Sequence, residues 1–274
     1  MKIITLISDM GVRDSYLASV KATIYGLYPQ AQIVDISHHV APFDIAQASF
    51  ILRSVYHEFP KGSIHIIGVN PEKYIPTGLF PTTEHTRHLA IEYKGYFFIG
   101  ADNGIFSLLF DEAPDGIYEL DFELTPEEQT FPVKSVFARA ACFIAAGKHP
   151  REFATAADGI RERQLIRPLI EKDAIKGSVI YIDTYGNVIT NITRKIFEEN
   201  RRGRKFLVSF RGNEHELDTL RQNYSEVPEG EMLAFFNSTG NLEIAINKGV
   251  EGMGGGASSL VSLKLNDSVR VDFR

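Results

Sequence analysis

Several features common in other classes of protein are scarce in this chain of 274 residues. It has one cysteine, Cys142, so no internal disulfide can form, and the apolar neighbours of Cys142 favour a buried thiol over a catalytic one. No run of about 18 apolar residues occurs, and the first residues lack the charged and apolar segments of a secretory signal. From these absences we expect a cytoplasmic protein without a membrane-spanning segment.

The sequence also lacks an excess of basic residues. It has 35 acidic and 29 basic residues, which gives a formal net charge of −6. Proteins that bind a phosphate backbone usually carry a basic patch, so nucleic acid is not an expected partner. The glycine-rich segment 252–259 lacks the lysine of a phosphate loop and opens no predicted helix, so we interpret it as a mobile surface loop.

The first half of the chain alternates strand patterns with helix patterns. Strands are predicted at 3–7, 33–36 and 63–69, and helices at 15–27, 44–55 and 134–146. A hairpin is predicted at 89–99, around Lys94-Gly95. This order favours an α/β domain with a mostly parallel central sheet, which binds ligands at the carboxyl ends of its strands.

The second half consists of closely spaced strand patterns separated by turn residues. Strands are predicted at 177–182, 188–192, 206–210, 231–236, 242–246 and 268–273. This texture predicts an all-β domain. With a linker at 167–173, the predicted domains are residues 1–168 and 174–274.

Two carboxylates follow the first predicted strand. Asp14 directly precedes the helix expected from Ser15, so it is a candidate N-cap as well as a candidate site residue. Asp9 precedes a glycine and caps no predicted helix. We therefore expect Asp9 to face a ligand at the strand end.

Polar residues also follow the next strands. Asn70 ends the third strand in Val69-Asn70-Pro71, where the proline is expected to hold it extended. Asp102 and Asn103 follow the predicted hairpin, and either could cap a short helix at 105–110.

The β domain contributes two more polar segments. Asp183 has apolar neighbours and would be costly to bury without a partner, which a ligand ammonium would supply; the alternative is a plain hairpin turn at 185–187. The segment 237–247 is a second candidate, although by itself it is typical of a polar turn between strands.

Taken in order and spacing, these segments resemble the S-adenosylmethionine hydroxide adenosyltransferases, a family related to fluorinating and chlorinating enzymes that use the same substrate. Ser8-Asp9-Met10-Gly11 is similar to the family's Thr-Asp-Phe-Gly opening, and 33–38, 102–104, 185–192 and 237–245 are similar to its other signatures. The resemblance covers nearly the whole chain. It implies an α/β N-terminal domain, a β-barrel C-terminal domain, and a homotrimer with sites between neighbouring subunits, without a metal or a separate cofactor.

The resemblance also implies roles for individual residues. Asp9 would hold the ribose hydroxyls, because a carboxylate can accept from both. Asp183 and Ser238 would hold the methionine ammonium and carboxylate, and Asn187 would bind the adenine edge. Two apolar walls of the site are predicted, Phe131 and either Phe235 or Phe236. Asp14 and Asn247 are the remaining predicted substrate-binding residues.

In the family reaction, water or hydroxide attacks the ribose 5′ carbon and methionine leaves, which gives adenosine and methionine. The sequence departs from the family where that water is activated. Asn70 replaces the expected Asp and Pro132 replaces the expected His, while Arg87 is the candidate for the family's Arg. Asparagine can orient water but cannot take its proton.

A base in another position would have to come from the long segment 72–88. Its candidates are Glu72, Glu84, His85 and His88, each of which is otherwise a solvated loop residue. The resemblance thus implies an S-adenosylmethionine hydrolase in which the catalytic residues would be Asn70 and Arg87. The alternatives are adenosyl transfer to a halide or another anion, and a catalytically silent protein that binds S-adenosylmethionine or adenosine.

Overall fold

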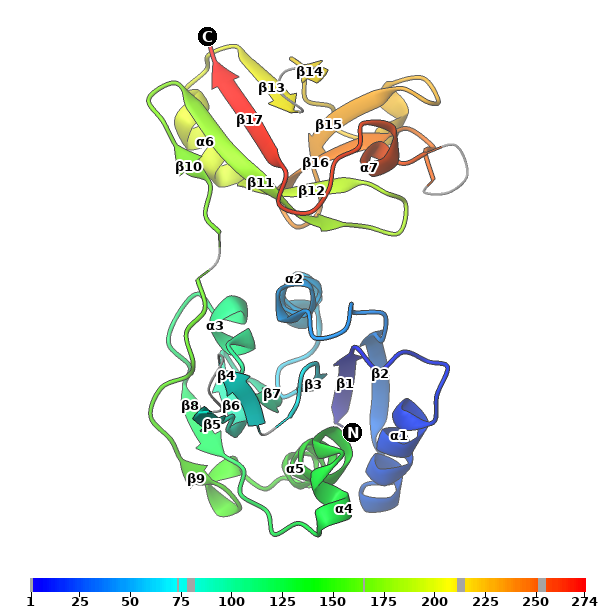
Figure 1. The fold of residues 1–274 in the computed structure, drawn as a ribbon, viewed down its shortest axis with the longest axis vertical. Helices are drawn as coiled ribbons and strands as arrows, with labels where there is room; N and C mark the ends of the chain where they lie inside the picture. Colours follow the sequence, from blue (N-terminus) through cyan, green and yellow to red (C-terminus); the bar gives the residue numbers. More distant parts are fainter. Residues whose placement is uncertain (1, 73, 78–81, 165, 211–214, 251–254) are drawn as a thin grey trace. The chain divides into compact units, whose positions relative to one another are not determined.

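The computed structural model divides the chain into two compact units, Met1–Gln164 and Leu165–Arg274 (Figure 1). It describes residues 2–72, 74–77, 82–164, 166–210, 215–250 and 255–274, with the backbone alone for 74–77 and 82–85. The boundary lies just before the predicted linker at 167–173, which contains a short strand, β10 (Leu169–Ile170).

Unit 1 is built on a seven-stranded sheet in the order β2-β1-β3-β7-β6-β8-β9. The strands are β1 (Ile3–Ser8), β2 (Gln32–Ser37), β3 (Ile64–Gly68), β6 (His88–Tyr93), β7 (Tyr96–Ala101), β8 (Gly116–Glu119) and β9 (Thr155–Ala156). A separate antiparallel hairpin, β4 (Tyr74–Thr77) and β5 (Thr82–His85), falls within the segment that we expected to be loop.

The sheet is mixed, so the prediction of a mostly parallel sheet is not confirmed. The pairs β1–β2, β1–β3 and β3–β7 are parallel, whereas β6–β7, β6–β8 and β8–β9 are antiparallel. The turn at Lys94 and Gly95, both at positive φ, connects β6 to β7 directly. A two-residue turn can join only antiparallel strands, because parallel strands need a long crossover.

Helices cover both faces of this sheet (Figure 1). They are α1 (Tyr16–Leu27), α2 (Ile45–Val55), α3 (Ile105–Leu109), α4 (Pro126–Gln129), the π-helical turn η2 (Val133–Phe137) and α5 (Ala138–Ala145), with short 3-10 turns η1 (Tyr56–Glu58) and η3 (Pro150–Glu152). Ile4 and Leu6 of β1 pack into the core with α1 and α5, and Ile7 into the core with α2 and α3. Successive strand residues point to opposite faces, so β1 is apolar on both.

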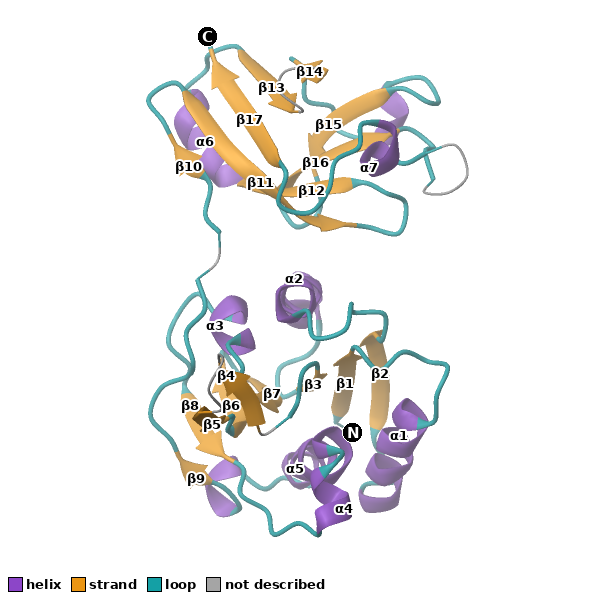
Figure 2. Cartoon of the chain, viewed as in Figure 1, coloured by secondary structure: helices purple, strands orange, loops and turns teal. Residues whose placement is uncertain are grey.

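Unit 2 is a nearly closed, antiparallel, barrel-like sheet in the order β14-β13-β17-β11-β12-β16-β15, with β10 beside β11 (Figure 2). The remaining strands are β11 (Ala174–Ile182), β12 (Val188–Thr193), β13 (Phe206–Phe210), β14 (His215–Leu217), β15 (Met232–Phe236), β16 (Asn241–Ile246) and β17 (Ser268–Phe273). A single bridge between Leu220 and Ala234 links the segment after β14 to β15. The predicted all-β character agrees with this sheet, to which the structure adds α6 (Arg194–Arg201), the 3-10 turn η4 (Tyr224–Glu226) and α7 (Ala257–Leu260).

No helix in the described part of the chain is long and apolar enough to cross a membrane.

Candidate functional site

Three polar segments meet at one edge of the unit 1 sheet, at the carboxyl ends of β1, β3 and β7. These strands are neighbours, and both pairs are parallel. Asp9 follows β1, Asn70 follows β3 and Asp102 follows β7. Parallel neighbours place their carboxyl ends at the same edge, where open α/β sheets bind ligands.

The carboxylate of Asp9 is held by two backbone amides. Its Oδ2 accepts the N–H of Phe43 at 2.9 Å and that of Asn70 at 3.4 Å. Among the residues that the structure describes, Oδ1 has no hydrogen-bond partner. Asp9 therefore has a fixed orientation and one carboxylate oxygen available to accept from a ligand hydroxyl.

Both amide donors to Asp9 have left-handed backbone conformations. Phe43 has a φ of 66° and Asn70 a φ of 46°, so the expectation that Pro71 holds Asn70 extended is wrong. Asparagine tolerates this region, whereas a bulky aromatic residue rarely adopts it. The strained Phe43, whose side chain is 64% exposed, is a site candidate that the sequence reasoning missed. Its only sequence signal is that it precedes the capping residue Asp44.

A buried serine–histidine contact fixes the loop that carries Asp9. Ser8 Oγ lies 2.7 Å from His38 Nδ1, and Gly11, at a φ of +68°, donates its N–H to the His38 carbonyl. His38 Nε2 lies 3.2 Å from Asp35 Oδ1. Burial raises the pKa of Asp35, but hydrogen bonds from Lys21 and His38 outweigh it and lower that pKa below its usual value.

Asn103 anchors the segment that carries Asn70. Its amide nitrogen donates to the carbonyls of Asn70 at 2.9 Å and Val69 at 3.1 Å. Its Oδ1 accepts the N–H of Ile105 at the start of α3. Gly104 occupies the N-cap position of α3 and has no side chain to accept a hydrogen bond. The Asn103 side chain instead accepts one of the free N–H groups at the start of the helix.

Arg87, the predicted catalytic arginine, forms an ion pair with Asp102, the residue that follows β7. Its Nη2 lies 2.7 Å from Asp102 Oδ2 and donates to the Gly159 carbonyl at 3.0 Å. The other oxygen of Asp102 accepts the N–H of Arg161 at 2.7 Å. The Asp102 side chain is 5% exposed. The ion pair joins the residue before β6 to the end of β7, and the hydrogen bonds to Gly159 and from Arg161 add the segment after β9.

The other site candidates of unit 1 are less constrained. Asp14 is exposed, and the N-cap of α1 is Ser15 without a side-chain cap, so the predicted capping role of Asp14 is not found. Phe131 is half-buried with its ring edge-on to Tyr16 at a centroid distance of 5.6 Å. Pro132 is buried at the start of η2.

The structure describes two of the four candidate bases fully. Glu72 is exposed, and no interaction is found for it among the described residues. His88 is 4% exposed, and its Nε2 lies 2.9 Å from the Pro71 carbonyl, to which it must donate. The side chains of Glu84 and His85 lie outside the described residues.

In unit 2, Asp183 and Asn187 form one hydrogen-bonded turn between β11 and β12. Asp183 Oδ1 accepts the N–H groups of Tyr185 and Asn187, each at 2.9 Å. Asp183 Oδ2 accepts the side-chain amide of Asn187 at 3.0 Å. The hairpin turn and the expected site residue are therefore the same feature, and three protein donors already satisfy Asp183 in part.

Tyr224 connects this turn to a buried carboxylate that the sequence reasoning missed. Its hydroxyl donates to Glu243 Oε1 at 2.7 Å and lies 3.4 Å from Asn187 Nδ2. Its ring stands edge-on to Phe235, one of the predicted apolar walls, at 4.8 Å. Burial raises the pKa of both Tyr224 and Glu243, and hydrogen bonds from Tyr224 and Asn237 partly offset this for Glu243. A charged residue in the apolar run 242–246 was the available signal.

The remaining candidates lie at opposite ends of β16. Ser238 is exposed in the turn from Asn237 to Asn241, where Asn237 Oδ1 accepts the N–H groups of Thr239 and Asn241. Asn247 follows β16, and its amide donates to the Val227 carbonyl at 2.7 Å. The structure thus brings Asp183, Asn187 and Phe235 together through Tyr224, and it shows no contact between them and Ser238 within the described residues.

The described end of the glycine-rich segment packs against the same turn and opens the helix α7 at Ala257, so the expectation of a surface loop without a helix is wrong there. A Cβ on Gly256 would lie 2.3 Å from the Tyr185 carbonyl oxygen, and Ser258 donates its N–H to the Gly186 carbonyl. Only glycine permits so close an approach. Residues 251–254 lie outside the described residues.

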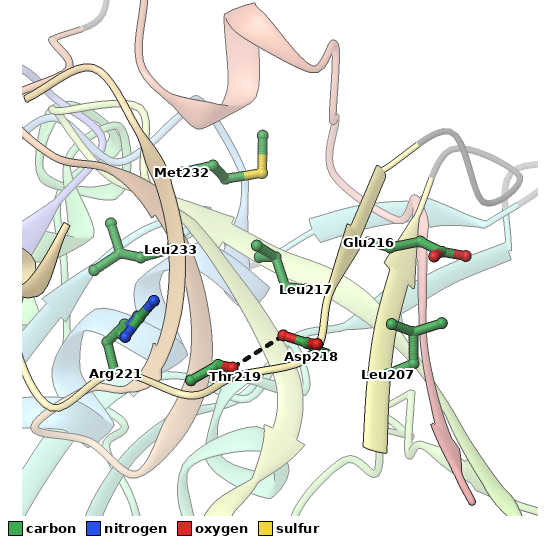
Figure 3. A pocket seen from close by; sticks show the side chains of 8 residues that line it. All are labelled: Leu207, Glu216, Leu217, Asp218, Thr219, Arg221, Met232 and Leu233. Atoms are coloured by element: carbon green, nitrogen blue, oxygen red, sulfur yellow. Dashed lines mark hydrogen bonds between the residues drawn. The ribbon is translucent and has the colours of Figure 1, made fainter. Parts of the chain in front are cut away.

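A separate cavity of about 310 Å³ lies at the seam of the barrel, between β13, β14 and β15 (Figure 3). It is lined by Leu207, Glu216, Leu217, Asp218, Thr219, Arg221, Met232 and Leu233. Among these lining residues, the Thr219 hydroxyl donates to Asp218 Oδ1 at 2.9 Å. None of the site residues predicted from the sequence lines this cavity.

Within the described residues, no three or more His, Cys, Asp or Glu side chains are grouped so that they could hold a metal ion.

Comparison with known proteins gives matches over both units. Residues 4–154 match the family model of the SAM hydroxide adenosyltransferase N-terminal domain, and residues 177–270 match that of its C-terminal domain. An (R)-S-adenosyl-L-methionine hydrolase of Thermus thermophilus is 29% identical over 264 residues, which cover 91% of this chain and 93% of the relative. A fluorinase of Nocardia brasiliensis is 27% identical over 280 residues, 89% of this chain and 90% of the relative. The crystal structure of a conserved Thermotoga maritima protein has a TM-score of 0.83 at 25% identity and covers 98% of this chain and 99% of its own.

Proposed function

Because this chain belongs to the SAM hydroxide adenosyltransferase family, we propose that it binds S-adenosylmethionine and hydrolyses it to adenosine and methionine. The observation that carries the proposal is the Asp9 carboxylate, held by two backbone amides at the sheet edge with Oδ1 available to a ligand. A fixed acceptor at this edge suits the two adjacent hydroxyls of a ribose.

The remaining parts of the substrate are assigned to both units. We propose that Asn187 binds the adenine edge, that Asp183 binds the methionine ammonium and that Ser238 binds the carboxylate. Asp183 Oδ2 accepts a single protein donor, so it keeps acceptor capacity for an ammonium. Phe131 and Phe235 are proposed as apolar walls, and the exposed Phe43, whose backbone N–H binds Asp9, is added to them. Asp14 and Asn247 stay predicted binding residues.

The proposed reaction is a displacement at the ribose 5′ carbon. A water oxygen forms the new bond to that carbon while the bond from carbon to sulfur breaks, and its electron pair neutralises the sulfonium. The water then loses one proton to solvent. Because the leaving group is already activated, the protein mainly has to position the water. The amide of Asn70 can orient that water but cannot accept its proton.

Slow turnover is expected because Asn70 and Pro132 stand where the family has an Asp and a His. Removing a general base typically costs roughly 10²- to 10⁴-fold in rate. His88 does not replace it through Nε2, which is bound to the Pro71 carbonyl. Arg87 is proposed to act through Asp102, since this ion pair lies next to Asn103, which holds the Asn70 backbone.

Adenosyl transfer to a halide is the second candidate function. It is favoured by the same replacements, since a halide needs no base, and by the similarity to a fluorinase. The third candidate is a protein that binds its ligand without turnover.

One experiment distinguishes these candidates. Purified protein is incubated with S-adenosylmethionine in ¹⁸O-labelled water, with and without chloride, and the products are separated and weighed. Hydrolysis predicts adenosine that carries the label at the 5′ oxygen, transfer predicts a halogenated adenosine, and a silent binder predicts calorimetric binding without product. Absence of binding would contradict all three.

The control for this experiment is Asp218→Asn, which removes an exposed carboxylate at the barrel seam, in a cavity that no proposed substrate-binding residue lines. We also propose a homotrimeric assembly and a cytoplasmic location, as expected from the family resemblance and from the sequence. Light scattering on the purified protein tests the assembly, and a mass of one or two chains would contradict it.

A further inference from the structure

Glu243 is a buried carboxylate for which the proposed reaction has no use. It lies on β16 with 4% of its surface exposed, between the buried residues Leu242 and Ile244. Burying a carboxylate is costly unless hydrogen bonds compensate for lost water. Two donors do so: the Tyr224 hydroxyl at 2.7 Å on Oε1 and the Asn237 amide at 3.0 Å on Oε2.

These contacts determine the direction of the Tyr224 hydroxyl. A phenol has one hydrogen to donate, and Glu243 accepts it, so the Tyr224 oxygen presents lone pairs to its other neighbours. The nearest such neighbour is Asn187 Nδ2 at 3.4 Å. This contact is longer than a typical hydrogen bond, but its polarity is favourable only when nitrogen faces the hydroxyl oxygen.

Asp183 favours the same orientation of the Asn187 side-chain amide. Asp183 Oδ2 lies 3.0 Å from Asn187 Nδ2, and a rotated amide would place two acceptor oxygens at that distance. Both hydrogens of the amide therefore point to protein acceptors. Asn187 Oδ1 lies on the opposite side, without a hydrogen-bond partner among the described residues.

An amide held in this way offers a ligand a hydrogen-bond acceptor. The 6-amino group of adenine is a matching donor, whereas the 6-oxo group of hypoxanthine would bring a second acceptor against Oδ1. An unpaired polar group at a desolvated contact lowers affinity by roughly ten- to a hundredfold.

We infer that Glu243 and Tyr224 are positioning residues that orient Asn187, so that the site takes 6-aminopurine nucleosides and rejects 6-oxopurine ones. This inference rests on the proposed function, in which Asn187 binds the adenine edge. It assigns a role to two residues that touch no substrate atom in that proposal.

The test is calorimetric binding of adenosine and of inosine to the full chain. Wild-type protein is expected to prefer adenosine by at least about tenfold. Tyr224→Phe keeps the ring against Phe235 but removes the lone pairs that face Asn187. Glu243→Leu removes the acceptor of the Tyr224 proton, which can then turn toward Asn187 and compete with Asp183 for the orientation of its amide. Each variant should lower the adenosine-to-inosine affinity ratio at least roughly threefold.

Tyr25→Phe, an exposed tyrosine on α1, is the matched control and should leave the ratio unchanged. Thermal unfolding checks that the variants are folded, and Tyr224→Phe decides alone if Glu243→Leu does not fold. Equal wild-type affinities for the two nucleosides, or an unchanged ratio in the folded variants, would overturn the inference while leaving hydrolysis intact. Failure of the wild type to bind either adenosine or S-adenosylmethionine would overturn the proposed function as well.

Discussion

The Asp9 carboxylate accepts the backbone N–H of Phe43 at 2.9 Å, and Phe43 makes this contact from a left-handed conformation with a φ of 66°. The contact joins the loop after β1 to the segment before α2, 34 residues apart in sequence. It ties the best candidate for ligand binding to a strained and exposed aromatic residue. Strain of this kind persists only where the surrounding structure imposes it.

Asp9→Asn should weaken S-adenosylmethionine binding by roughly 10- to 100-fold, because hydrogen bonds to a charged group contribute about 1.5–3 kcal/mol. The amide keeps the shape of the side chain but loses the charge and one acceptor. Calorimetry measures the dissociation constant, with Asp218→Asn as the control of equal charge change. Equal affinities in the wild type and in Asp9→Asn would refute the assignment.

Phe43→Gly should separate stability from binding. Glycine adopts positive φ freely, and relief of about 1–2 kcal/mol of backbone strain offsets the greater flexibility of the unfolded chain. The exposed ring buries little surface, so the melting temperature should change by only a few degrees. Affinity for S-adenosylmethionine should nevertheless fall several-fold when the apolar wall is lost. Thermal unfolding and calorimetry on one preparation measure both, and undiminished affinity would exclude contact between ring and ligand.

The double change Asn70→Asp with Pro132→His should raise the rate of adenosine formation by tenfold or more if the site keeps the family arrangement. The carboxylate introduced by Asn70→Asp would lie near Asp9, and the negative charge of Asp9 would raise the pKa of the introduced group. Because only its deprotonated form can act as a base, the gain in rate should appear as pH increases. A pH profile of product formation tests this. Pro132 is buried, so an unfolding curve must accompany it. An unchanged rate in a folded variant would mean that the site has been rebuilt.

Stability should fall in mild acid because of His65. Its side chain is fully buried, with Nδ1 2.8 Å from the Thr5 hydroxyl, and burial lowers its pKa from 6.5 to about 4. The unfolded state therefore binds the extra proton first, and the free energy of unfolding drops as pH falls from about 6.5 to 4, by up to about 3 kcal/mol. His65→Asn, which cannot titrate, should flatten this loss in urea unfolding at pH 7 and pH 5. Parallel pH profiles for both proteins would show that another group is responsible.

The sequence predicted most elements because their signals are local. Alternation and helical spacing located β1, β2, β3, α1, α2 and the β6–β7 hairpin to within one or two residues. The direction of pairing was harder to predict. Half of the sheet in unit 1 is antiparallel because β8 and β9 follow the hairpin at the sheet edge, and short strands carry little pattern of their own.

Candidate site residues followed the same division. Asp9 and Asn70 were located by their position after apolar strands, Asp183 by its apolar neighbours, and Asn187 by the family resemblance. Phe43 and Tyr224 have no such signal, and Glu243 has only its place in an apolar run, because the importance of all three comes from contacts across more than ten residues of sequence. The roles of all these residues in binding and catalysis stay predictions.

The sequence by itself determined that this chain has an α/β half and an all-β half, and that Asp9 stands at a strand end, because hydrophobic periodicity and turn residues act over a few positions. Only the tertiary structure decided that Phe43 holds Asp9, that Arg87 is neutralised by Asp102, and that Glu243 is buried. In β16, alternation would point Glu243 to solvent, opposite Leu242 and Ile244. The 3-10 turn that carries Tyr224 instead brings a hydroxyl to that carboxylate, and Val227, just after it, packs with Phe235 and Ala245. The cost of desolvating this carboxylate is offset by a hydrogen bond between distant segments, which no local pattern encodes.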